Sequence, residues 1–263
     1  MTDKRTYLRG RDVRPFVVPG GLVLCWGIFL WLSPNTSEVL APPQAVFMSL
    51  FAGLADGTLL KATVQTVLAS LGGLAVGATI GLALGILFGL WALIDKLLEV
   101  VVETIRPIPS VAVLPLAMLV FGFGYRMEIV IVAFPTIWPV MIMSRSAVRD
   151  LEPRLLDVAR VLGLDVAATV RQIVLPAIAP RILLAVRIAA GVALIVSITT
   201  EIAVNPIGLG AAIMEAQQTF QPARMLAILI WIGVIGYGWN AILLAMQKRI
   251  VPYQSAAAED ARA

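Results

Sequence analysis

The sequence predicts an all-α, polytopic membrane protein with about six transmembrane helices. Of its 263 residues, 60% are hydrophobic and only 14% are charged, and the mean hydropathy is +0.93. A soluble domain of this length could not bury so much apolar surface. The net charge of +4 does not predict a nucleic-acid partner, because the basic residues lie between apolar runs, as they do in the loops of membrane proteins.

The first predicted span covers residues 16–32 and follows a basic N-terminal segment, residues 1–15, which we expect in the cytoplasm. This apolar run is longer than the core of a usual secretory signal, and the sequence after Leu32 lacks a small-x-small cleavage pattern. The run is therefore predicted to be an uncleaved membrane helix.

Other apolar windows long enough to cross about 30 Å of hydrocarbon predict the remaining spans. They cover residues 66–90, 108–123, 128–144, 182–204 and 225–246. Prolines interrupt the windows 108–123 and 128–144, so kinked helices buried among their neighbours are expected there. Six crossings make residues 16–250 a transmembrane region and place the tail, residues 251–263, in the cytoplasm, where its composition predicts disorder.

The lysines and arginines support this topology. With the N-terminus inside, the external segments hold only Lys61, Arg126 and Arg224, whereas sixteen basic residues lie in internal segments and Arg187 falls within a span. This asymmetry is the positive-inside pattern of membrane proteins. It predicts that residues 145–181 form a cytoplasmic loop.

Residues 33–61 form an external connection that is not purely polar. Pro42 and Pro43 lead into an apolar patch at residues 46–54. We expect an amphipathic segment along the outer face of the membrane. Contact of this segment with a docking protein is the alternative.

Glycines recur at every fourth position of the second span. They are Gly73, Gly77, Gly81, Gly85 and Gly89. Residues spaced by four lie on one face of a helix, so the glycines form a helix-packing ridge that another helix can approach closely. Packing within the chain's own bundle is the favoured role, and a dimer contact or a pore lining is the alternative. A phosphate-binding loop is excluded, because it needs a strand-turn-helix setting.

The loop at residues 145–181 is polar and rich in arginine. Glu152 and Pro153 predict a helix over residues 153–162, since an acid and a proline suit a first turn. The apolar residues of this helix share one face: Leu155, Val158, Ala159 and Leu162. Arg154, Asp157 and Arg160 lie off that face, where they can pair with each other or with a partner.

The same loop predicts a second short helix after a glycine. Gly163 is expected to end the first helix with a left-handed backbone, and Asp165 is expected to cap the second. The second helix should run to Leu175 and Pro176. Two short helices joined at a glycine would make a compact projection from the bilayer.

A known signature matches this loop. It reads glutamate-alanine-alanine, three residues, glycine, nine residues, isoleucine-x-leucine-proline, and it is matched at Asp157, Ala159, Gly163, Ile173, Leu175 and Pro176. The chain thereby resembles the permease subunits of ATP-binding-cassette (ABC) importers, in which this loop engages the ATPase. It departs from the signature at Asp157, which has a shorter reach than glutamate, and at Val158, which is larger than alanine.

Further segments resemble one subgroup of these permeases, which serves sulfonate, taurine, nitrate and pyrimidine-precursor importers. They are Arg106-Pro-Ile-Pro-Ser-Val-Ala-Val-Leu-Pro-Leu, Phe121-Gly-Phe-Gly, Val186-Arg-Ile-Ala, Glu201 and Gly208-Leu-Gly. The resemblance covers roughly residues 35–250, and the cytoplasmic loop is its most specific part.

The resemblance implies a type I importer permease fold with a cytoplasmic coupling helix, in a bacterial inner membrane. It further implies a homodimer that forms a pathway for a small solute by alternating access. An external solute-binding protein and two ATPase subunits would be the partners. ATP and Mg would be bound by those ATPases, because this chain has no glycine-rich loop ending in Gly-Lys-Ser/Thr. The implied coupling residues are Arg154, Asp157, Ala159, Arg160, Gly163, Asp165, Ile173, Leu175 and Pro176.

Two ionisable residues fall within one predicted span. Arg187 lies near its cytoplasmic end, where a long side chain can reach back to water. Glu201 follows Thr200 near the outer end, where an acid should be paired, protonated or facing a water-filled cavity. We expect either that Glu201 and Thr200 belong to a gate or pathway, or that Glu201 bonds to backbone amides of the turn at residues 205–210.

Other polar residues of the spans are predicted to have ordinary roles. Glu128, at the start of a span, is expected to be a surface charge beside Arg126. Asn240 and Gln247 in the last span are expected to form hydrogen bonds between helices.

Catalysis by this chain is not expected. The sequence has no histidine and one cysteine, Cys25, within an apolar run, so the commonest general base and a cysteine-rich metal cluster are both missing. An intramembrane enzyme would depend on isolated serines, which normally bond to their own backbone. A self-contained secondary transporter or channel is the alternative function, but Glu201 alone gives it little support.

Overall fold

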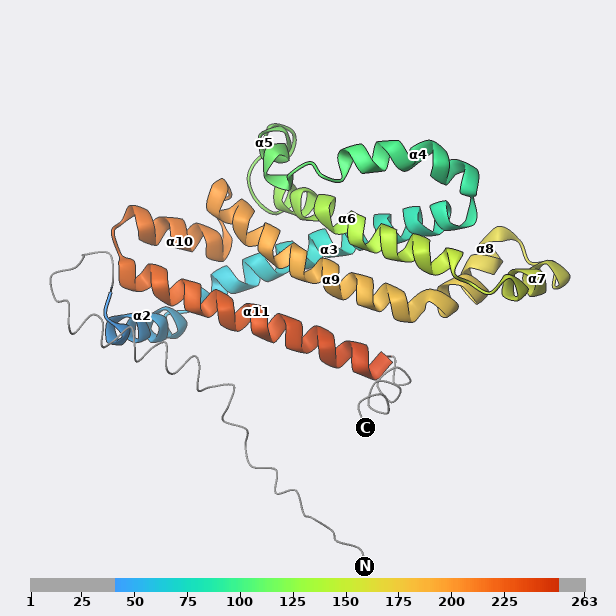
Figure 1. The fold of residues 1–263 in the computed structure, drawn as a ribbon. Helices are drawn as coiled ribbons and strands as arrows, with labels where there is room; N and C mark the ends of the chain where they lie inside the picture. The colour runs from blue at the N-terminus through green and yellow to red at the C-terminus, as the bar shows by residue number, and fades with distance from the viewer. Residues whose placement is uncertain (1–40, 251–263) are drawn as a thin grey trace, which may run out of the picture.

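The computed structural model describes residues 41–250, and every regular element in that range is a helix (Figure 1). Four helices are long and apolar enough to cross a membrane, and a fifth crossing results if one bent pair of helices counts as a single span. The predicted all-α membrane fold is confirmed. The predicted number of six is not reached within the described residues, which do not include the first predicted span (16–32) or the segments 1–15 and 251–263.

Four long helices correspond to four of the predicted spans. They are α3 (Thr58–Leu90), α6 (Tyr125–Arg149), α9 (Leu175–Ala203) and α11 (Pro222–Ile250). Helix α6 stays continuous although Pro135 and Pro139 lie inside it. Prolines of this kind are tolerated in a membrane helix, because groups of neighbouring helices can bond to the carbonyl groups that the prolines leave without a donor.

The prediction of one span over residues 108–123 is wrong. This segment forms a short 3₁₀ helix (Ser110–Val113) and α5 (Leu114–Phe121), and it pairs with α4 (Ala92–Ile105) at a bend of 86°. Pro107 and Pro109 stand between α4 and the 3₁₀ helix, where they prevent a continuous hydrogen-bond ladder. Helix α4 folds back over the bundle from the end of α3 at the extended residue Trp91, and the bend at the prolines then leads the chain into α5 (Figure 1).

Helices α3 and α6 are packed closely along the glycine ridge. A Cβ atom added at Gly81 would lie 2.5 Å from the backbone oxygen of Ile137, and one at Gly85 would lie 2.6 Å from that of Met141. The ridge faces α6 residues that are also spaced by four: Val132, Thr136, Val140, Ser144 and Val148. The glycines thus permit helix contact inside the chain's own bundle, against which α9 packs its buried alanines, Ala185, Ala189, Ala190 and Ala193.

Shorter helices lie at the two ends of the bundle, which we name the α7 end and the α10 end (Figure 1). Helices α7 (Pro153–Val161) and α8 (Val166–Thr169) lie at the first, and α10 (Gly208–Gln218) lies at the second. The predicted amphipathic segment is α2 (Pro43–Ala55). Its Val46 and Leu50 are buried in a cluster with α10 and α11, while Phe47, Met48 and Phe51 are exposed.

Candidate functional site

The loop at the α7 end begins with the predicted helix. Helix α7 has Pro153 in its first turn and ends before Gly163, which has a φ of 64°. The N–H of Gly163 donates to Arg160 and the N–H of Leu164 donates to Ala159, at 3.1 and 3.0 Å. These bonds satisfy the last carbonyl groups of the helix, and they require the left-handed backbone that glycine adopts most easily.

The second arm of the loop is longer than predicted. Asp165 caps α8 by accepting the N–H of Ala168 at 2.7 Å. The chain then continues through a π-helical turn, Val170–Val174, directly into α9. The expectation that this arm ends at Leu175 and Pro176 is wrong, because Pro176 lies in the first turn of α9, where a missing N–H is tolerated. The loop is therefore continuous with a spanning helix.

Helix α7 exposes most of its apolar side chains. Of the predicted apolar face, Ala159 is buried, while Leu155, Val158 and Leu162 are exposed. Val161 adds to them with 87% exposure. We name Leu155, Val158, Val161 and Leu162 the coupling face. An exposed apolar surface of this kind on a short, structured helix is typical of a site where another protein binds.

The charged residues of α7 pair locally, as the spacing indicates. Arg160 donates to Asp157 at 2.8 Å, and Arg154 lies 3.6 Å from Glu152. All four side chains are exposed, with at least 62% of their surface open, so these pairs contribute little to stability and are free to exchange for a partner's charges. The signature residues Ile173 and Leu175 are half-buried on either side of the buried Val174, and Pro176 is exposed.

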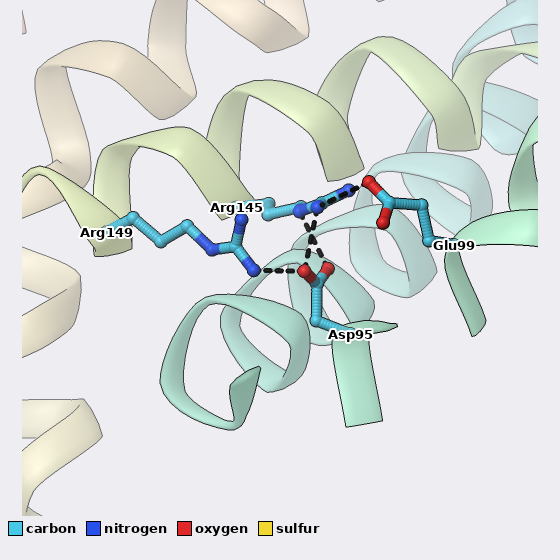
Figure 2. Close-up of polar contacts among 4 residues, drawn as sticks. All are labelled: Asp95, Glu99, Arg145 and Arg149. Atoms are coloured by element: carbon cyan, nitrogen blue, oxygen red, sulfur yellow. Dashed lines mark hydrogen bonds and ion pairs between the residues drawn. The ribbon is translucent and has the colours of Figure 1, made fainter. Parts of the chain in front are cut away.

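An ion cluster around the buried Asp95 joins α4 to the end of α6, where this loop begins (Figure 2). Asp95 of α4, whose side chain is 3% exposed, receives two contacts of 2.7 Å from the guanidinium of Arg145 and a further contact from Arg149. Arg145 also reaches Glu99 at 3.3 Å. Directly after α6, Asp150 accepts from Arg181 of α9 at 2.5 Å. These pairs hold α4, α6 and α9 together next to α7.

The predicted spans did not indicate the Asp95 cluster, because residues 91–107 fall between two of them, in an internal loop. The sequence does contain a signal for this amphipathic helix. Asp95, Glu99 and Glu103 are spaced by four between apolar residues, which is the pattern of an amphipathic helix with one acidic face.

A polar network lies at the α10 end, around Glu201. This carboxylate is 2% exposed, and its Oε2 accepts the N–H of Gly210 at 2.8 Å and the hydroxyl of Thr66 at 3.0 Å. Thr66 accepts the N–H of Leu209 at 2.9 Å, and Gln65 accepts that of Gly208 at 3.1 Å. The first three N–H groups of α10, which a helix leaves without internal partners, are thus satisfied by side chains of α3 and α9.

This placement corresponds to the second expectation for Glu201, a bond to a backbone amide of residues 205–210, here that of Gly210. Thr200 is buried beside it and donates to the backbone of Val196 at 2.8 Å. Gly208 has a φ of 90°, and a Cβ atom there would overlap the carboxylate of Glu201. The turn therefore depends on a glycine for both its backbone and its space.

The expectation that Glu128 is a surface charge is wrong. Its side chain is fully buried, and it accepts from Asn205 Nδ2 at 2.7 Å and from the Ser197 hydroxyl. Asn205 in turn accepts the N–H of Gly124 at 2.9 Å. Glu128 is buried because the turn between α9 and α10 folds over the start of α6, whereas Arg126 of the same turn of helix stays exposed.

A cavity of about 780 Å³ opens beside this network, between α3, α10 and α11. Lys61 and Arg224 line it together with Gln65, Asn205 and Glu215. Arg224 lies 3.6 Å from Glu215, so the charges of the wall are partly balanced.

Asp56 supplies a further negative charge near Arg224. The N–H and the hydroxyl of Thr58 donate to Asp56 at 2.9 and 2.7 Å. These two hydrogen bonds hold the pKa of Asp56 below its usual value, so the carboxylate is ionised at neutral pH. Both acids, Asp56 and Glu215, therefore accompany the arginine.

The polar residues within the long helices meet one another. Arg187 donates to Gln247 at 3.1 Å and to Asn240 at 3.3 Å. Asn240 and Gln247 of α11 thus form hydrogen bonds to another helix, and their partner in both bonds is Arg187 of α9. No group of acids and cysteines suited to a metal ion occurs among residues 41–247.

A bundle of membrane-spanning helices that has a helix with an exposed apolar face at one end, and a polar cavity at the other, is the arrangement expected of a membrane transport subunit. Comparison with known families is consistent with that class. Residues 77–254 match the family described as binding-protein-dependent transport system inner membrane component. The chain belongs to this family of ABC importer permeases, and the family predicted from the loop signature is confirmed.

Relatives of the predicted subgroup are found among known proteins. The chain is 26% identical over 243 residues to SsuC of Bacillus subtilis, which is named for aliphatic sulfonates transport, covering 92% of this chain and 88% of SsuC. It is 29% identical over 188 residues to the nitrate import permease protein NrtB of Leptolyngbya laminosa, covering 70% of this chain and 67% of NrtB.

The fold is also similar to a solved transporter. A chain of the methionine ABC transporter MetNI, solved in inward-facing conformations, matches with a TM-score of 0.58 and 20% identity. The match covers 71% of this chain and 95% of that one. At this identity the likeness concerns the fold alone, and it agrees with the predicted type I importer permease fold.

Proposed function

We propose that two copies of this chain form the pathway of an ATP-driven importer, and that α7 is the element on which a partner ATPase acts. The coupling face carries this proposal, because its exposed side chains lie on a short helix that ends at Gly163 and whose Leu156 packs against the buried cluster of α6 and α9. ATP and Mg²⁺ belong to the ATPase, and each of two ATPase subunits would engage one α7.

The proposed motion follows the covalent path from α7 to the cavity. Closure of the ATPases displaces α7, and α8 and the π-helical turn pass this displacement to α9 without an interruption of the helix. The far end of α9 carries Glu201, which is bonded to α10. Movement at the α7 end can thereby change the cavity at the α10 end, as alternating access requires.

The proposed solute is a small anion of the sulfonate, taurine or nitrate class, or a heteroaromatic nutrient, delivered by an external solute-binding protein. The names of SsuC and NrtB support the anions. The proposed location is a bacterial inner membrane, with the α7 end and both termini in the cytoplasm and the α10 end outside. The basic residues near α7 support this orientation.

Co-purification of the tagged chain from its own host tests the proposal. A co-purified ATPase should be lost in Val161→Glu, because a charge in the coupling face opposes burial against the partner. Phe220→Glu is the matched control, since Phe220 is 91% exposed but lies at the α10 end, and it should leave the ATPase bound. Solute accumulation by the chain alone in liposomes, unchanged by Val161→Glu, would overturn the proposal in favour of a self-contained transporter.

A further inference from the structure

Arg187 carries a positive charge into the bundle and contacts only neutral groups there. Its guanidinium donates to Gln247 Oε1 at 3.1 Å and to Asn240 Oδ1 at 3.3 Å. Among residues 41–247, it forms no ion pair with an aspartate or glutamate, in contrast to Arg145, Arg149 and Arg181. A guanidinium has five N–H groups, so these two bonds leave donors for a further acceptor.

The neighbours of Arg187 place it at membrane depth. Ala185 and Ala189, on either side along α9, are fully buried in a cluster with Val140 of α6. Val140 stands about 7.5 Å, five residues at the helical rise, before Arg145, the first charge at the α7 end of α6. A charge at this depth is costly against lipid, and it is normally found facing a protein interior or a water-filled path.

The two amides complete a group of donors. Since Asn240 and Gln247 turn their oxygen atoms toward Arg187, their NH₂ groups point away from the cation and can donate elsewhere. Within the described part of the chain, neither NH₂ group has an acceptor among the hydrogen bonds formed. Three side chains from two helices therefore present N–H groups, and no carboxylate of residues 41–247 pairs with the arginine. A cluster of donors of this kind is typical of an anion-binding site.

The side of α9 and α11 that carries this group is open. Gly191 follows Arg187 by one turn on α9, and Gly233 and Gly236 precede Asn240 on the facing part of α11. A Cβ atom added at Gly191 or Gly233 would meet nothing within 4 Å, and one at Gly236 would meet only Leu194 at 3.9 Å. Gly191 and Gly233 are exposed, so a solute can approach Arg187 from this side, whereas Trp239 and Leu243 of α11 pack against the buried alanines of α9 on the other side.

We propose that Arg187, Asn240 and Gln247 form a contact site for an oxyanion on the open side of α9 and α11, where the site can face the transport pathway. The planar guanidinium matches two oxygen atoms of a sulfonate or nitrate, and the two amides add donors from α11. The role in transport depends on the proposed function, but the attraction of an anion to Arg187 does not. The cavity at the α10 end is a weaker candidate for such a site, because Glu215 lies in its wall with Lys61 and Arg224, and Asp56 lies close to Arg224.

Fluorescence quenching of Trp239 tests the site without partner proteins. Trp239 precedes Asn240 and donates to the backbone of Ala190 at 3.1 Å, so it reports on this part of the interface. The full chain would be placed in nanodiscs with its other tryptophans changed to phenylalanine: Trp26, Trp31, Trp91, Trp138 and Trp231. The probes would be iodide as an anionic quencher, acrylamide as a neutral one, and methanesulfonate as a competitor.

We expect Arg187→Gln to lower the iodide quenching constant of Trp239 by about threefold or more, with acrylamide quenching unchanged. Arg187→Lys should retain most of the iodide effect, and Arg126→Gln, at the α10 end, should retain all of it. Methanesulfonate should protect Trp239 from iodide in the chain that keeps Arg187. Equal iodide constants with and without the arginine would overturn the proposal.

The competition decides the question if Arg187→Gln does not fold. Absence of protection by methanesulfonate in the chain with Arg187 would then overturn the proposal, and protection would support it. In the assembled transporter, Arg187→Gln should raise the KM for the anion while the ATPase stays bound. If no ATPase co-purified with the unsubstituted chain, the proposed function would be contradicted. The quenching result would still decide whether Arg187 attracts an anion.

Discussion

The backbone N–H of Gly210 donates to Glu201 Oε2 at 2.8 Å, so a carboxylate of α9 holds the first turn of α10. Glu201→Leu should lower the free energy of unfolding by about 1–3 kcal/mol, because it leaves a buried N–H group without an acceptor. Glu201→Gln keeps an acceptor and should lose less. Protein yield and thermal unfolding in detergent measure both. Normal yield of Glu201→Gln combined with abolished uptake would instead support a role of Glu201 in the gate.

Gly208 and Gly57 separate backbone strain from lack of space. Both have positive φ angles, 90° and 79°, but a Cβ atom at Gly208 would overlap Glu201, while one at Gly57 would meet nothing within 4 Å. Gly57→Ala should cost about 1–2 kcal/mol from strain, and Gly208→Ala should cost more. Melting temperatures of the two variants test the difference. Equal losses would show that the contact between Gly208 and Glu201 is unimportant.

The sequence predicted those features that local pattern determines. The apolar windows, the start of α7 at Pro153, its stop at Gly163 and the cap at Asp165 depend on a few neighbouring residues. Features that depend on distant contacts were missed. Glu128 is buried because the turn at Asn205 folds over it, and nothing in residues 125–131 indicates that turn.

Prolines explain two further differences between the predicted and the observed helices. The window 108–123 has the composition of a span, but hydropathy does not record that Pro107 and Pro109 break the helix into a bent pair. In the opposite direction, Pro176 was expected to end the loop, whereas it begins α9. A proline marks a helix boundary, and the sequence alone does not specify on which side the helix lies.

The ridge of α3 predicts a sharp contrast between glycines. Gly85→Ala should destabilise the chain by about 1–3 kcal/mol through overpacking, because its Cβ atom would lie 2.6 Å from the backbone oxygen of Met141. Gly238→Ala in α11 meets nothing within 4 Å and should be neutral or stabilising by up to about 1 kcal/mol. Unfolding in detergent compares the two. Similar stabilities would mean that α3 and α6 are not in close contact.

The Asp95 cluster predicts a further pair of outcomes. Asp95→Asn should lower the free energy of unfolding by about 2–3 kcal/mol, somewhat less than for a fully buried pair, because Arg149 is 40% exposed. Glu99→Gln is the control, since Glu99 is 45% exposed and 3.3 Å from Arg145, and it should change stability by less than about 0.5 kcal/mol. Thermal unfolding measures both. If Glu99→Gln cost as much as Asp95→Asn, burial of Asp95 would not be the cause.

Gly163 tests whether the shape of the loop matters for coupling. Its φ is 64° and a Cβ atom there would meet nothing within 4 Å, so a substitution acts through the backbone and not through a clash. Asparagine tolerates the left-handed region, whereas valine resists it by at least about 1–2 kcal/mol, which reduces the population of the native loop by roughly tenfold. Uptake by the assembled transporter should therefore be kept in Gly163→Asn and fall in Gly163→Val, with similar yields of both proteins. Equal uptake by the two variants would show that the left-handed end of α7 is not required for transmission between the ATPase and α9.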